Sequence, residues 1–117
     1  MNTIEISVLK YGEVEAVTLS GALLLGTSVN SLRQKIENLA DHGIRKFVFD
    51  LTSVGRIDSS GIGLLVEILC STKKDGGSLK LVSPSKQVLQ TLRMCSLLPL
   101  FEIFDEEKVA IASFGRS

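Results

Sequence analysis

Residues 47–65 read FVFDLTSVGRIDSSGIGLL, a strand-forming run followed by a polar stretch and then by the start of a helix. Residues 47–51 are mostly apolar strand formers, a pattern typical of a central strand buried on both faces. Residues 52–57 predict a short loop. A helix is predicted from about Asp58 to about Lys74. This succession of strand, loop and helix predicts an α/β unit.

Two strands are predicted before this unit, over residues 4–8 and 14–19, close enough in sequence to form a hairpin. An amphipathic helix is predicted over residues 28–42, because apolar residues recur there at helical spacing. Thr27 or Ser28 is the predicted N-cap of this helix.

Three more elements and a short terminal helix are predicted after the central unit. A strand is predicted over residues 79–82. Ser83 followed by Pro84 predicts the N-cap and first position of a third helix. Residues 101–104 predict a last strand, and the acidic residues 105–107 open a terminal helix.

The order ββαβαβαβα predicts an α/β fold with a mixed sheet of about five strands and about four helices packed against it. The chain has 117 residues, the size of one ordinary domain. It contains no internal repeat, low-complexity tract or linker. We therefore expect a single domain over residues 1–117.

The charge balance excludes a typical nucleic-acid binder, because thirteen basic residues offset thirteen acidic ones. Weak charge repulsion allows either a monomer or a weak homodimer. Cys70 and Cys95 are predicted to be small buried residues of helices. No signal peptide is predicted, and no apolar run approaches the roughly 20 residues that cross a bilayer. We expect a cytoplasmic protein with no direct membrane insertion.

The candidate functional centre is Asp58-Ser59-Ser60-Gly61, where the central strand gives way to a helix. Ligand and partner sites of open α/β sheets lie beyond the carboxyl ends of the strands. A phosphate on a serine at a helix N-terminus is tolerated there, because free N–H groups and the helix dipole favour negative charge. The alternative interpretation is a plain helix cap, with Asp58 or Ser59 as N-cap.

Two glycines in the first turns of this helix need an explanation, because each costs about 1 kcal/mol relative to alanine. They are Gly61 and Gly63. One explanation is tight packing of the helix backbone against the sheet. The other is that a partner or a phosphate closely approaches the start of the helix.

The sequence from Ile57 to Leu65, placed after the strand at 47–51, resembles the STAS domain of bacterial anti-sigma-factor antagonists. In that family the unphosphorylated protein binds an anti-sigma factor that is also a serine kinase, which frees the sigma factor. The kinase phosphorylates the serine after the motif aspartate and the complex separates. A PP2C-type phosphatase restores binding. The resemblance implies Ser59 as phosphoacceptor, with Ser60 as runner-up.

The resemblance also implies a partner-binding surface made of Asp58, Ser59, Ser60, Gly61, Ile62, Gly21, Ala22, Leu23 and Leu24. Family members often carry acidic residues just after the glycine that ends the second strand. This chain has Ala22-Leu23-Leu24-Leu25 there. We expect at least two of these leucines to be core residues, or the group to form an exposed apolar contact patch.

Three other functions compete with this prediction. An enzyme is disfavoured, because the single histidine, His42, ends a surface helix and no metal-ligand cluster or cofactor-binding loop is present. A STAS domain also serves as a regulatory or scaffold subunit of a signalling assembly or a membrane transport complex. A constitutive binding module, in which Ser59 only caps the helix, is the third alternative.

Overall fold

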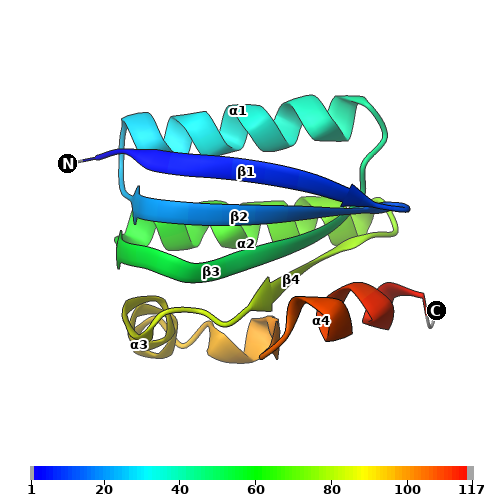
Figure 1. Cartoon of the computed structure of the whole chain (residues 1–117). Coiled ribbons are helices and arrows are strands. Elements are labelled where there is room, and N and C mark those ends of the chain that lie inside the picture. The colour runs from blue at the N-terminus through cyan, green and yellow to red at the C-terminus, as the bar shows by residue number, and fades with distance from the viewer. Residues whose placement is uncertain (1, 116–117) are drawn as a thin grey trace.

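The computed structural model describes residues 2–115, which form one five-stranded sheet with strands in the order β1-β2-β3-β4-β5. The elements are β1 (Ile4–Tyr11), β2 (Val14–Leu23), α1 (Thr27–Asp41), β3 (Lys46–Ile57), α2 (Ser59–Lys74), β4 (Ser78–Val82), α3 (Lys86–Met94), the 3₁₀ turn η1 (Leu98–Leu100), β5 (Glu102–Phe104) and α4 (Glu107–Phe114). β1 and β2 form an antiparallel hairpin, and every later pair of neighbours is parallel. The predicted mixed sheet and the predicted order of elements are confirmed (Figure 1).

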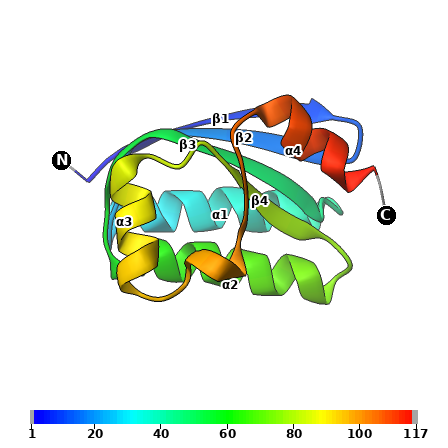
Figure 2. The same cartoon turned by 90° about the horizontal axis from the view of Figure 1, so that it is seen from below.

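Helices cover both faces of the sheet. α1 and α2 pack on one face and α4 on the other, and α3 lies on the same side as α1 and α2 and adds Val88 and Leu92 to their core (Figure 2). The side chains of β3 alternate between the two sides: Phe47 and Phe49 belong to the core under α1 and α2, whereas Val48 packs with Phe114 of α4. All three β3 side chains have no exposed surface. The prediction of a strand buried on both faces is therefore confirmed.

Strands β2 and β3 are longer than predicted. Residues 52–57 form a strand, not a loop, and β2 continues past Gly21 to Leu23. The two strands run on together beyond the last residue pair of β3 and β4, with Leu23 opposite Ile57. Register shifts interrupt the alternation, and half of this extension is exposed, which explains why its sequence looks like a loop.

Gly21 lies inside β2 and does not end it. Its φ is +116°, and a Cβ there would lie 2.6 Å from the carbonyl oxygen of Thr3. The next residue, Ala22, donates its N–H to that same oxygen at 2.9 Å. Glycine is required because the start of β1 crosses close to this point of β2.

Two predicted helix caps are wrong, because the serine hydroxyls have other partners. The N-cap of α1 is Gly26, and the buried hydroxyl of Ser28 instead accepts the N–H of Leu24 at 2.8 Å. The N-cap of α3 is Ser85, not Ser83. Ser83 has a φ of +44°, and its hydroxyl donates to the carbonyl of Asp105 at 3.1 Å.

Ser85 joins α3 to the extension of β3. Its hydroxyl donates to the carbonyl of Val54 at 2.6 Å and accepts the N–H of Val88 at 3.3 Å. Its own N–H donates to the carbonyl of Leu51 at 3.2 Å. β4 has ended at this level, so a capping serine takes the place of a neighbouring strand.

Both cysteines are exposed free thiols, so their predicted burial is wrong. Cys70 lies on the outer face of α2, in line with the exposed residue Glu67 three positions earlier. Cys95 is the C-cap of α3, and its side chain is exposed instead of continuing the apolar face of that helix.

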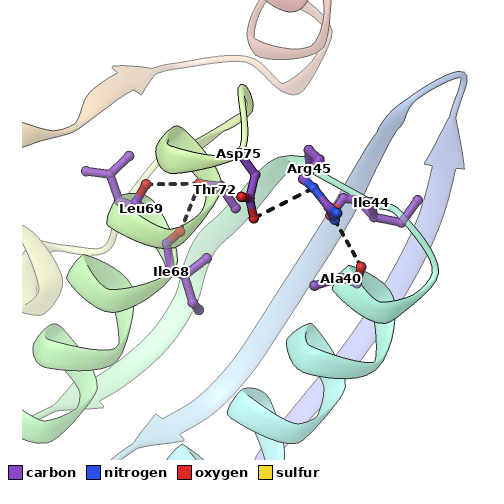
Figure 3. A network of polar contacts seen from close by, with 7 residues as sticks. All are labelled: Ala40, Ile44, Arg45, Ile68, Leu69, Thr72 and Asp75. Atoms are coloured by element: carbon purple, nitrogen blue, oxygen red, sulfur yellow. Dashed lines mark hydrogen bonds and ion pairs between the residues drawn. The ribbon is translucent and has the colours of Figure 1, made fainter.

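The amino ends of the parallel strands are closed by a network around Arg45 (Figure 3). The Arg45 guanidinium donates to the carbonyl of Ala40 at 3.0 Å and lies 3.8 Å from the carboxylate of Asp75. The Arg45 carbonyl accepts the N–H of Ser78 at 3.1 Å. A Cβ on Gly77 would lie only 1.7 Å from that carbonyl oxygen, so the two loops are in backbone contact.

Candidate functional site

The candidate site lies at the other end of the sheet, where β2 and β3 finish and α1 and α2 begin (Figure 1). The N–H of Asp58 is 3.4 Å from the carbonyl oxygen of Leu23 at the end of β2. A Cβ on Gly61 would lie 2.4 Å from that same oxygen. Tight backbone packing therefore explains this glycine, as the first of the two predicted explanations requires.

Asp58 holds the site together. One carboxylate oxygen accepts the N–H of Gly61 in the first turn of α2, and the other accepts the N–H of Leu25, each at 3.0 Å. Asp58 is thus the N-cap of α2, one of the two residues predicted for that role. Its second hydrogen bond, which couples the loop after β2 to the start of α2, is not foreseeable from local sequence.

The carboxyl group of Asp58 is held in its ionised form. Partial burial raises its pKa, but hydrogen bonds from the backbone N–H groups of Leu25, Gly61 and Ser60 outweigh that effect. The net result is a pKa below the usual value for aspartate. A fixed negative charge therefore stands directly before Ser59.

The two serines after Asp58 differ in exposure. Ser59 is exposed and Ser60 is half-buried. Neither hydroxyl makes a hydrogen bond to another residue within the described part of the chain. Because Asp58 supplies the helix cap, the fold does not use the Ser59 hydroxyl, which is available to solvent.

The predicted partner surface is only partly at the surface. The side chains of Ala22, Leu23 and Ile62 are at most 5% exposed, so they belong to the core beneath the site and cannot contact a partner directly. Leu24 is half-buried. We expected at least two of these leucines in the core, but only Leu23 is fully buried. Leu25 is the exposed leucine of the loop, with 72% of its surface accessible.

A contact from the beginning of the chain fixes the loop that carries Leu24 and Leu25. The side-chain amide of Asn2 donates to the carbonyl of Leu25 at 2.6 Å, and its oxygen accepts the N–H of Ser28 at 3.3 Å. The Ser28 hydroxyl also contacts the Asn2 oxygen and donates to the carbonyl of Leu24 at 3.0 Å. Sequence reasoning missed Asn2, since no local pattern links it to residues some 25 positions away.

A groove of about 360 Å³ adjoins the site, between the end of β3 and α3. Its lining residues are Leu24, Gly55, Arg56, Ile57, Asp58, Gln87, Gln90 and Thr91. Arg56 is exposed and takes part in none of the ion pairs found within residues 2–115. The groove therefore offers one unpaired cation beside the start of α2.

Residues 2–115 contain no group of three His, Cys, Asp or Glu side chains that could hold a metal ion. His42 is the C-cap of α1, at the end of the sheet opposite Ser59, and its Nδ1 lies 2.8 Å from the carbonyl of Asn38. The structure therefore does not bring Ser59 and His42 together as a nucleophile and base. Within the described range, no helix is long and apolar enough to cross a membrane.

Comparison with known proteins places these observations in a family. A family model for the STAS domain matches residues 5–110. An anti-sigma factor antagonist assigned in Thermotoga maritima is 33% identical over 80 residues, which are 68% of this chain and 71% of that protein. The anti-sigma-B factor antagonist of Bacillus subtilis is 33% identical over 72 residues, which are 62% of this chain and 65% of that protein. These names describe regulators of sigma factors, not enzymes.

Solved structures show the same fold. The anti-sigma factor antagonist SpoIIAA in its unphosphorylated form superposes with a TM-score of 0.80 at 20% identity, covering 97% of this chain and 99% of that one. The Bacillus SpoIIAA structure in the phosphorylated form gives a TM-score of 0.75 at 21% identity, covering 94% and 99%. The fold class predicted from the sequence is thereby confirmed.

Proposed function

The chain belongs to the STAS domain family, and we propose that it is an anti-sigma-factor antagonist controlled by phosphorylation of Ser59. Unphosphorylated, it binds an anti-sigma factor that is a serine kinase, and the sigma factor is released. The kinase then phosphorylates Ser59 and the complex separates. The chain itself performs no catalysis, and a PP2C-type phosphatase returns it to the binding form in the cytoplasm.

The observation that carries this proposal is that Asp58 caps α2, which leaves the Ser59 hydroxyl without a structural role. Asp58 makes both hydrogen bonds that the start of α2 and the neighbouring loop require. Ser59 is exposed, and its hydroxyl has no partner within residues 2–115. A serine that the fold does not use can be modified without loss of structure. Ser60 is half-buried, which makes it the less accessible acceptor.

Electrostatics explains how a phosphate would act. A phosphoserine carries about −1.5 to −2 charges at pH 7. At the N-terminus of the 16-residue helix α2 the helix dipole favours this charge, so the fold remains intact. Together with the ionised Asp58, it would place a strongly negative centre on the surface that the partner must cover. Desolvating that centre is costly, so the complex dissociates.

Two groups of relatives support the proposed switch. SpoIIAA, whose fold this chain shares, is known in unphosphorylated and phosphorylated forms. The Bacillus subtilis relative is an anti-sigma-B factor antagonist, and the Thermotoga maritima relative is assigned to the same class. The acids that often follow Gly21 in this family are absent here, so we propose that apolar contact through Leu24 and Leu25 replaces them.

The decisive experiment is capture of the partner from native cell lysate with the full chain, followed by intact-mass measurement with and without ATP. We expect capture of a kinase-like ATPase and, with ATP, a mass gain equal to one phosphate group. Ser59→Ala should keep binding and prevent the mass gain, whereas Ser60→Ala is the matched control and should still gain it. Capture of a transporter component or a large particle, without phosphate, would instead favour the scaffold or transport role.

A further inference from the structure

Two glycines of this chain have no structural reason within the fold. Of the ten glycines, five have positive φ, Gly61 and Gly77 lie against backbone, and Gly115 is the C-cap of α4. Gly55 and Gly63 have no positive φ, and a Cβ added to either would meet no atom within 4 Å. Alanine would fit at both without strain.

Retaining glycine at these positions has an energetic disadvantage for the isolated chain. Gly63 lies in the second turn of α2, where alanine is a much better helix former. Gly55 is the extra residue at the register shift between β2 and β3, but its φ is outside the left-handed range, so the bulge does not require glycine. No contact among the described residues accounts for either glycine.

The two glycines flank the proposed phosphoacceptor. Gly63 follows Ser59 by four residues, so both lie on the same exposed face of α2, one turn apart. Gly55 precedes it by four residues and lines the groove between β3 and α3. A partner that binds Ser59 from the groove contacts Gly55, and one that binds Ser59 from the exposed face of α2 contacts Gly63.

We propose that the anti-sigma kinase docks with its main chain in close contact with both Gly55 and Gly63, so that each glycine makes room for the partner's backbone. This inference rests on the proposed function, because the occupant is the same kinase. Two charged residues line the groove at Gly55: the unpaired Arg56, and Asp58, whose carboxylate oxygens already accept the N–H groups of Leu25 and Gly61. The segment seated there therefore presents an acidic side chain to Arg56. The exposed Leu25 supplies an apolar contact on the adjoining loop.

The surface that the kinase covers in this proposal is larger than the immediate surroundings of Ser59. It extends onto α3, where Gln87, Gln90 and Thr91 lie on one helix face and form the far wall of the groove. These side chains are neutral, so they neither repel nor neutralise an acidic segment. The positive charge that selects the segment comes from Arg56.

The test measures binding and stability in the same variants: the wild-type chain, Gly55→Ala, Gly63→Ala and Ser71→Ala. Ser71 is exposed farther along α2 and serves as the matched control. The binding probe is the purified kinase that the wild-type chain captures. We expect both glycine variants to raise the Kd at least tenfold, while their melting temperatures stay equal to or above that of the wild type. Ser71→Ala should leave the Kd unchanged.

Charge is tested separately with Arg56→Glu and Arg56→Gln. We expect Arg56→Glu to weaken kinase binding more than Arg56→Gln, and added salt to reduce the difference. If both glycine variants bind like the wild type while Ser59→Glu loses binding, the docking inference is overturned and the proposed function stands. If the wild-type chain binds no kinase, the proposed function itself fails.

Discussion

Gly77 and Gly63, which lie towards opposite ends of the sheet, have different surroundings. At the amino ends of the parallel strands, Gly77 lies against the carbonyl of Arg45, and Arg45 is itself bonded to Ala40 and paired with Asp75. At the carboxyl ends, a Cβ added to Gly63 would have open space around it. One end is closed by contacts within the chain, whereas the other keeps unused groups at its surface. Folding explains Gly77, whereas we have proposed that a partner explains Gly63.

The largest effect on stability is expected at the closed end. Gly77→Ala should lower the free energy of unfolding by about 3 kcal/mol, because its methyl group would overlap the Arg45 carbonyl and force the backbone to move. Urea unfolding measures this loss. Gly63→Ala is the matched control and should be neutral or stabilising by up to about 1 kcal/mol. Equal losses in the two variants would remove the distinction between the ends.

A smaller effect is expected from Asp58, which caps α2 and binds the loop after β2 at the open end. Asp58→Ala should lower the free energy of unfolding by about 1–2 kcal/mol, because α2 loses its cap and Leu25 N–H loses its acceptor. The folded-state pKa of Asp58 lies below its unfolded value, so its contribution is present at neutral pH and is lost as the pH falls below about 4. Urea titrations between pH 7 and pH 3 follow this loss.

Asp58→Asn separates charge from hydrogen bonding in that measurement. The amide oxygen can still accept one backbone N–H, so this variant should retain part of the cap at pH 7. Its stability should lack the acid-dependent component attributed to residue 58. A wild-type profile identical to that of Asp58→Asn would show that the carboxylate is not the titrating group.

The smallest effect on stability is expected at Ser59. Ser59→Glu should change the free energy of unfolding by less than about 0.5 kcal/mol, because the favourable helix dipole is offset by repulsion from Asp58. The same variant should weaken binding to the captured kinase at least tenfold. Isothermal titration calorimetry and urea unfolding on one preparation give both values. Unchanged affinity would count against the phosphorylation switch.

Much of the fold is encoded in local patterns that the sequence displays openly. The central strand is recognisable because its two buried faces leave no polar alternation at Phe47, Val48 and Phe49. The start of α2 is recognisable because Asp58 is a strong cap residue. The extension of β2 and β3 is hidden, since its register shifts break the alternation on which strand prediction depends.

The rest depends on contacts between distant segments. Ser83 is a plausible cap in sequence, but its hydroxyl bonds to Asp105, whereas Ser85 caps α3 and bonds to Val54 of the distant strand β3. The position of Leu25 is set by Asn2 and Asp58, which lie far from it along the chain. The choice of Ser59 as phosphoacceptor came from a family resemblance and remains a prediction, although its exposure agrees with it.

The packing of α3 on β3 also protects the end of β3 from pairing with a strand of another molecule. Where β4 stops, the next carbonyls of β3 would form a bare sheet edge, the usual template for aggregation. Ser85 occupies two of them, on Leu51 and Val54, with its N–H and its hydroxyl. An intruding strand would therefore have to dislodge a helix before it could add to the sheet. A partner's strand cannot extend the sheet at this point unless α3 first moves away from β3.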